Sequence, residues 1–313
     1  MGKKKFTGVS QFLARFRGWI QAGAALLTNL HLPNFLKGGL YQGAGKTVCV
    51  PGLNCYSCPA ASGACPIGAF QAVVGSSKFS FSYYITGILI LLGVLLGRFI
   101  CGFLCPFGWF QELLHKIPSR KLSTRKLKPL RYLKYAILLV MVFLLPAFLV
   151  NDVGMGDPFF CKYLCPQGVL EGAIPLSLAN SGIRAALGSL FTWKLAILLV
   201  VIVLSVLFYR PFCKWICPLG AFYALLNKVS LVQMKVDQSK CISCGKCAKA
   251  CKMDVDVTKS PNHTECIRCG MCVRACPTNA VHFRCGFGTG KQGTVLPEKT
   301  NKQMNDIVKE KKS

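Results

Sequence analysis

The stretch CGFLCPFGWF, residues 101–110, places two cysteines and a proline directly after an apolar run. Its C-P-x-G core occurs four times, as CPIGAF at 65–70, CPFGWF at 105–110, CPQGVL at 165–170 and CPLGAF at 217–222. A repeat of this kind indicates one structural unit that the fold uses several times. Proline is favoured at the first position of a helix, so each unit is expected to begin a helix with a cysteine at its N-terminus.

The composition argues against two familiar classes of protein. The chain has 313 residues, of which 52% are hydrophobic and 19 are cysteines, so it is too long and too apolar for a small disulfide scaffold. A net charge of +27 is common among nucleic-acid-binding proteins. Here, however, Lys and Arg crowd into some loops and avoid others, as they do in membrane proteins. The partners expected are therefore a membrane and redox proteins, and no nucleic acid.

Apolar runs predict the membrane spans. Residues 81–97 carry no charge, and residues 132–150 and 191–209 each carry one lysine near the start. Each run approaches the roughly 20 residues that cross a hydrocarbon core. Residues 18–36 are more polar, and on their own they fit a span, an interfacial helix or a signal peptide.

The charges of the loops orient these spans. Residues 1–17, 98–134 and 210–313 hold 32 of the Lys and Arg residues, whereas residues 37–80 and 151–194 hold 6. Positive loops face the cytoplasm, so the protein is predicted to lie in the cell membrane with both termini cytoplasmic. Because that topology needs an even number of crossings, residues 18–36 become the first of four spans.

This topology pairs the repeat units into two sites of four cysteines, one at each face of the membrane. The inner site is predicted to consist of Cys101, Cys105, Cys213 and Cys217. The outer site is predicted to consist of Cys58, Cys65, Cys161 and Cys165, with Cys55 as an alternative ligand. The outer unit is irregular, since no cysteine lies four residues before Cys65, and Cys49 has no assigned role.

Four thiolates in one place suit zinc or an iron–sulfur cluster. A cysteine at a helix N-terminus is stabilised as an anion by the helix dipole, and the following glycine lets the backbone approach closely. One [4Fe–4S] cluster is therefore predicted at the inner face and one at the outer face. Disulfides are the alternative for the outer cysteines, which would face an oxidising compartment, and inert packing is the alternative for all of them.

The strongest motif lies further along the chain. Residues 241–251 and 266–276 both read C-x2-C-x2-C-x3-C, the run of a bacterial ferredoxin with two clusters, in which the fourth cysteine crosses to the other cluster. The first [4Fe–4S] cluster is thus predicted on Cys241, Cys244, Cys247 and Cys276. The second is predicted on Cys251, Cys266, Cys269 and Cys272. Lys252 stands where such runs have proline, a position that is not a ligand.

The predicted fold is an all-α four-helix membrane domain at 18–230 joined to a small α+β ferredoxin-like domain at 235–285. A basic cytoplasmic segment, 1–17, precedes them, and a flexible basic tail, 286–313, follows. The basic residues of the ferredoxin-like domain could steer an acidic carrier such as a flavodoxin or ferredoxin, or could simply follow the positive-inside rule.

With these motifs in hand, residues 10–285 resemble the polytopic membrane iron–sulfur family that includes NapH-like quinol dehydrogenase subunits and NosR-like proteins. The matching elements are the two C-x-x-x-C-P units that begin at Cys101 and Cys213 and the paired ferredoxin run. The resemblance implies electron transfer between a quinone pool and partner redox proteins. The outer units are an addition to the minimal pattern and suggest a conduit with centres on both sides.

The function predicted is a membrane-bound electron-transfer protein that relays electrons between cytoplasmic carriers and a quinone pool or an outer-face redox partner. No catalytic residue is identified, and any quinol dehydrogenase activity rests on the resemblance. A factor for redox sensing, metal handling or assembly is the alternative that uses the same clusters. A zinc-stabilised scaffold is a third, and it predicts a colourless protein.

Overall fold

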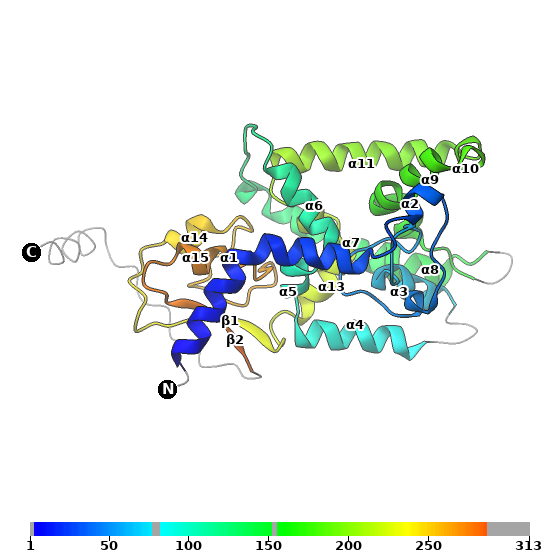
Figure 1. Ribbon diagram of the computed structural model, residues 1–313. Helices are drawn as coiled ribbons and strands as arrows, with labels where there is room; N and C mark the ends of the chain where they lie inside the picture. Colours follow the sequence, from blue (N-terminus) through cyan, green and yellow to red (C-terminus); the bar gives the residue numbers. More distant parts are fainter. Residues whose placement is uncertain (1–2, 77–81, 152–154, 287–313) are drawn as a thin grey trace, which may run out of the picture.

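The computed structural model describes residues 3–76, 82–151 and 155–286. These residues are mostly helical and include one small sheet. Long helices run along the molecule, and the ferredoxin-like domain lies at one end of them (Figure 1). The long helical segments are α1 (Lys3–Thr28), α4 (Tyr83–Leu95), α11 (Ser189–Leu207) and a continuous segment made of α7 (Leu133–Ile137), a π-helix (Leu138–Leu144) and α8 (Leu145–Phe148). Helices α4 and α11 lie on opposite sides of the molecule in this view.

Two helices in the described residues are long and apolar enough to cross a membrane, namely Leu127–Phe148 and Ser189–Leu207. Helix α11 has an apolar exterior, with Leu199, Val200 and Val203 each more than half exposed. An apolar surface of this kind is typical of contact with lipid or protein. These helices indicate membrane association.

The other two predicted spans differ from the helices found. Helix α1 covers Lys3–Thr28 rather than 18–36, because a turn after Thr28 and Pro33 separate it from the short α2 (Asn34–Lys37). Helix α4 has 13 residues, since the chain turns at Gly97, whose φ of 55° favours glycine. Its predicted start at residue 81 lies outside the described residues.

Short helices that begin at the Cys-Pro steps fill the space between the long ones. These are α3 (Pro66–Gly75), α6 (Pro106–His115) and α13 (Pro218–Leu226), and the third unit continues into a π-helix (Gly168–Ala173). Cys65, Cys105 and Cys217 are the N-cap residues of their helices, with proline next in each. The helix start predicted from the repeat is therefore found in these three units.

The remaining elements connect these parts. They are the 3-10 helices Ala44–Thr47 and Arg125–Tyr132, the π-helix Phe160–Leu164, and α5 (Phe99–Phe103), α9 (Ile174–Ala179), α10 (Ser181–Ala185) and α12 (Pro211–Trp215). One buried core contains cysteines of both predicted membrane sites, including Cys65, Cys101 and Cys165. The two sites are thus embedded in continuous packing.

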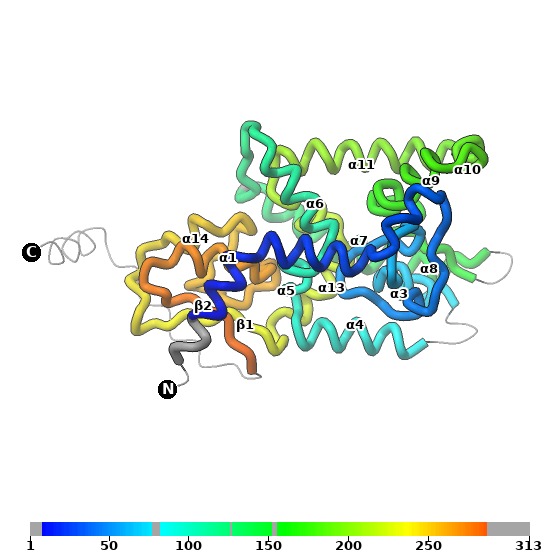
Figure 2. The backbone as a smooth tube through the Cα atoms, in the orientation of Figure 1, coloured from blue at the N-terminus to red at the C-terminus, as the bar shows by residue number. Residues whose placement is uncertain are grey.

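The ferredoxin-like domain is a two-stranded antiparallel sheet, β1 (Val232–Val236) with β2 (Val281–Cys285), and two short helices, α14 (Lys246–Ala250) and α15 (Met271–Ala275). Its first strand starts at Val232, slightly before the predicted boundary. The N-terminal helix α1 lies along the domain (Figure 2), and Ala14 of α1 and Phe103 of α5 share its core with Phe283. Beyond Gly286, the predicted tail lies outside the described residues.

Candidate iron–sulfur sites

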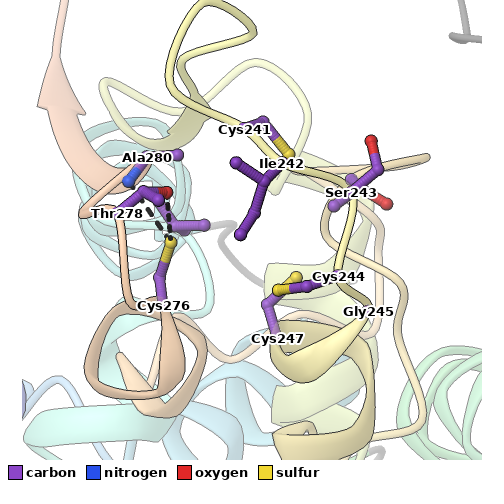
Figure 3. A pocket seen from close by; sticks show the side chains of 11 residues that line it. Cys241, Ile242, Ser243, Cys244, Gly245, Cys247, Cys276, Thr278 and Ala280 are labelled. Carbon is purple, nitrogen blue, oxygen red and sulfur yellow. Dashed lines mark hydrogen bonds between the residues drawn. The ribbon is translucent and has the colours of Figure 1, made fainter. Parts of the chain in front are cut away.

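The first ferredoxin site, called site A, is a pocket lined by Cys241, Cys244, Cys247 and Cys276. Figure 3 shows the four thiols around one space, with Ile242 beside them. Cys276 comes from the second cysteine run and crosses to the other three, as the spacing predicts. This arrangement of donors fits a cluster held by four thiolates.

The half-buried Cys276 differs from the buried thiols in the direction of its pKa shift. Burial opposes its ionisation, but hydrogen bonds from the Thr278 side chain and from backbone amides outweigh burial and lower the pKa. The Ala280 amide donates to Cys276 Sγ at 3.3 Å (Figure 3). Such hydrogen bonds stabilise the thiolate form that a metal ligand requires.

The second ferredoxin site, called site B, is the site predicted on Cys251, Cys266, Cys269 and Cys272. The other three are close enough to Cys272 for their charges to raise its pKa, although desolvation is the larger cause. Its loop is built like that of site A. Ser243 and Gly245 have φ of 54° and 68°, and the equivalent Arg268 and Gly270 have 53° and 76°.

The inner site is also a pocket, in which the two inner repeat units meet. Its lining includes all four predicted cysteines, Cys101, Cys105, Cys213 and Cys217. Leu53, from the distant loop before the first unit, and the fully buried Tyr223 close the pocket. The repeat predicts that its glycine lets the backbone approach the site closely. In the last unit, the Gly220 amide donates a hydrogen bond to Cys217 Sγ at 3.3 Å.

Burial has the larger effect on the inner thiol Cys105. Desolvation and the neighbouring Cys213 and Cys101 raise the pKa of Cys105 to about 12, whereas amides of Leu53 and Gly108 act in the opposite direction. The helix N-terminus alone therefore does not ionise Cys105. A positively charged iron centre would, since metal binding releases thiol protons.

The outer units also converge, and Cys55, the predicted alternative ligand, lies among the other three thiols. Cys65, Cys161 and Cys165 lie close enough for their charges to interact, and Cys55 interacts with all three. A Cβ at Gly68 would lie 3.7 Å from Cys161 Sγ, and one at Gly168 would lie 3.7 Å from Cys55 Sγ. Each glycine of an outer unit thus faces a cysteine of the other unit.

Cys58, the predicted ligand, lies at the edge of this group. Its side chain is 1% exposed, packs with Ala60 and Ala61, and faces Asn29 Oδ1 at 3.6 Å. Cys55 instead occupies the position between the units, and Glu171 accepts a hydrogen bond from its amide at 3.0 Å. All nineteen cysteines are free thiols in the structure.

Residues 51–54 bring the inner and outer sites together. A Cβ at Gly52 would lie 2.8 Å from Cys105 Cα, so the loop passes directly over the inner unit. The amide of Leu53 faces Cys105 and the next amide, that of Asn54, faces Cys65, and each opposes the rise that burial causes in the pKa of its thiol. One peptide unit, which spans about 3.8 Å, therefore separates the amides that face the inner and the outer thiols. The two sites are therefore not a bilayer apart.

The ferredoxin-like domain abuts the inner unit at Gly102. A Cβ there would overlap the carbonyl oxygen of Ile267 and lie 3.7 Å from Cys269 Cα. The Gly102→Ala variant is expected to force the domain away from the inner unit and to lower the thermal midpoint of unfolding by several degrees. The matched control is Gly87→Ala in α4, where nothing lies within 4 Å of the new Cβ and alanine favours the helix. Equal midpoints for the two variants would contradict this contact.

Site A and the inner site each bring four thiols to one pocket. Four thiolates in one place suit either a zinc ion or an iron–sulfur cluster. The C-x2-C-x2-C-x3-C spacing that supplies site A is the spacing of iron–sulfur ferredoxins.

Sequence reasoning missed one position in the repeat. The first two units extend beyond C-P-x-G as CPIGAFQ and CPFGWFQ, and their glutamines, Gln71 and Gln111, are both fully buried. Aligning the four units over seven residues instead of four would have revealed this position. The loop amides of Leu53 and Asn54 had no signal in the sequence, because backbone groups carry none.

The comparisons with known proteins agree with this chemistry. One 4Fe-4S binding domain model matches residues 63–84, 80–125, 134–174 and 190–237, and a second model of the same description matches 234–255 and 260–282. The first covers the Cys-Pro units and the second covers the ferredoxin runs. No solved structure matches the chain.

Curated relatives are similar over about half of the chain. An uncharacterized protein of Methanocaldococcus jannaschii is 28% identical over 182 residues, which are 55% of this chain and 66% of the relative. The putative electron transport protein YccM of Escherichia coli is 26% identical, covering 54% and 45%. The ferredoxin-type protein NapH of Haemophilus influenzae is 25% identical, covering 56% and 54%. The chain thus spans between roughly half and two thirds of the length of these relatives.

Fold, thiol sites and domain matches define a ferredoxin-type 4Fe-4S protein. The chain therefore belongs to the 4Fe-4S binding proteins, and it is similar to relatives named YccM, MauN, NapH and NosR.

Proposed function

We propose that this protein conducts electrons across a membrane through four [4Fe–4S] centres in series, held by site A, site B, the inner site and the outer site. When bound, each centre would supply one-electron redox chemistry over a potential range set by its surroundings. The observation that carries the proposal is the Leu53–Asn54 step, whose consecutive amides face the inner and the outer thiols.

Contacts between neighbouring sites support a series rather than four isolated centres. Cys247 of site A lies close enough to Cys272 of site B for their charges to interact. Gly102 of the inner unit contacts the backbone of site B at Ile267 and Cys269. The residues at each junction are buried or half-buried, so protein rather than water separates the sites.

For the outer site we propose Cys55, Cys65, Cys161 and Cys165 as ligands. Cys55 is preferred to Cys58 because its charge interacts with all three other thiols, whereas Cys58 packs against alanines. The loop charges support four crossings with both termini in the cytoplasm, so that site A would be the cytoplasmic end of the series.

Transfer across vesicles tests the proposal. Purified protein would be placed in vesicles with ferricyanide trapped inside and dithionite added outside. Ferricyanide reduction is expected only in vesicles that contain the protein, and it should fall to the protein-free rate for Cys161→Ser. Protein with its full iron content that does not reduce ferricyanide would contradict a conduit. Reduction of an added quinone by that same protein would make the quinone pool the membrane acceptor.

The cytoplasmic partner proposed is an acidic one-electron carrier such as a flavodoxin or ferredoxin. Lys246 and Lys249 are exposed on α14, the helix that carries Cys247 of site A, and Ile242 in the lining of that site is half exposed. Opposite charges steer such encounters and raise association rates.

The double variant Lys246→Glu/Lys249→Glu is expected to slow reduction by an acidic ferredoxin about tenfold at low salt. The difference should shrink at high salt, where charges are screened. Arg184→Glu, an exposed change on α10 far from site A in Figure 1, is the control and should leave the rate unchanged. Equal rates for wild type and double variant at low salt would argue that these lysines only follow the positive-inside rule.

A further inference from the structure

The residue six positions after each Cys-Pro cysteine reaches across to a neighbouring segment of the chain. The residues at this position are Gln71, Gln111, Glu171 and Tyr223. Each is on the helix that its own Cys-Pro step begins, about two turns from the N-terminal cysteine. The position is polar in all four units, although the helices around it are mostly apolar.

Two of these residues make the same pair of contacts at different sites. At the inner site, Gln111 Nε2 donates to Cys213 Sγ at 3.1 Å, and its Oε1 accepts from the Phe212 amide at 3.2 Å. At the outer site, Gln71 Nε2 donates to Cys161 Sγ at 3.2 Å, and its Oε1 accepts from the Phe160 amide at 3.0 Å. Both amide ends are therefore fixed, and the NH2 group is held toward the sulfur.

In the other two units, the residue at this position makes a hydrogen bond to the chain but none to a cysteine sulfur. Glu171 Oε2 accepts from the Cys55 amide at 3.0 Å, and Tyr223 donates its hydroxyl proton to Pro51 O at 3.0 Å. Both contacts hold the loop that lies between the inner and outer sites. Only the glutamines thus present a donor to a candidate ligand.

We propose that Gln71 and Gln111 are positioning residues that hold one ligand of the outer and inner site and raise the reduction potential of the centre bound there. The inference rests on the proposed function and adds which residues set the potentials. A hydrogen bond to a ligand sulfur stabilises negative charge on it, and reduction adds negative charge. Because both glutamines are fully buried, water does not replace the bond when it is removed.

The test is a potentiometric titration of the purified full chain, followed by electron paramagnetic resonance, with iron measured on each sample. Gln111→Leu is expected to lower the midpoint potential of the inner centre only, and Gln71→Leu that of the outer centre only. Gln111→Glu should lower it further, because a carboxylate donates no hydrogen bond and adds charge. The control is Gln21→Leu on α1, whose amide is buried and has no hydrogen-bond partner among the described residues.

The outcomes separate this inference from the proposed function. Variants that keep their iron and their midpoint potentials would overturn the inference. Variants that lose the iron of their own site, while the other centres keep their midpoint potentials, would also overturn it. If Cys161→Ala keeps all of the iron, the outer site holds no centre, so the conduit and the Gln71 part both fail. A lower midpoint potential of the inner centre in Gln111→Leu would still support the inference at the inner site.

Discussion

The Cys161→Ala variant is expected to hold about twelve irons per chain where the unaltered chain holds about sixteen, because each [4Fe–4S] centre carries four. Cys161 contacts the other outer unit directly: it faces Gly68 and accepts a hydrogen bond from Gln71. Iron and acid-labile sulfide would be measured after anaerobic purification in detergent. The expected result is the loss of about four irons and about four sulfides per chain, the content of one [4Fe–4S] centre.

Matched variants decide which cysteine completes the outer site. Cys55→Ala should lose the same four irons, whereas Cys58→Ala should keep about sixteen. The exposed Cys285→Ala is the control for any effect of removing a thiol. Twelve irons in the wild type and in all of these variants would mean that the outer thiols bind no centre. They would then be disulfides or spare thiols, and the protein would serve a quinone from its cytoplasmic side.

The ferredoxin ligands could be predicted because their spacing is local. Each run holds three ligands within seven residues, and the crossing of Cys251 and Cys276 follows from how two such runs pack. The pocket of site A contains the four predicted thiols. The inner four were predicted from repetition and topology together, and they also line one pocket.

The outer site shows where the sequence stops being informative. Cys55 and Cys58 are three residues apart in an irregular unit, and neither lies four residues before Cys65. Which thiol lies against the second outer unit depends on how the loop folds over Gly168, a tertiary contact that leaves no pattern in the sequence. The closeness of the two sites was likewise not predictable, because it comes from backbone amides of residues 53 and 54.

The helices were predicted with similar limits. Apolar runs gave α11 and the segment that includes α7 and α8 within a few residues. Helix α1 was misplaced because its N-terminal half is basic and was taken for a cytoplasmic segment. In the structure that half packs Ala14 against Phe283 of the ferredoxin-like domain, so tertiary contact rather than hydropathy determines its extent.

Replacing Glu265 is expected to cost about 3–5 kcal/mol of folding free energy, because it leaves two buried cations without their counter-ion. Lys134 Nζ lies 2.6 Å from Glu265 Oε1, and Arg98 Nη1 lies 2.9 Å from Oε2. Both cationic side chains are fully buried. Burial disfavours the charged carboxyl, but Arg98 and Lys134 outweigh it and lower the pKa of Glu265 to about 2. The triad therefore stays ionised, and it joins the ferredoxin-like domain to α7.

The measurement is the thermal unfolding midpoint of Glu265→Gln in detergent, followed by ellipticity and by loss of the iron–sulfur absorbance. Glutamine keeps the shape of the side chain and removes its charge, so the expected drop of several degrees comes from the unpaired cations. Asp157→Asn is the control, because its ion pair with Lys162 is 2.5 Å long but exposed and should contribute little. If both variants unfold with the wild type, the docking of the domain rests on the contact at Gly102 and on the apolar core around Phe103 instead.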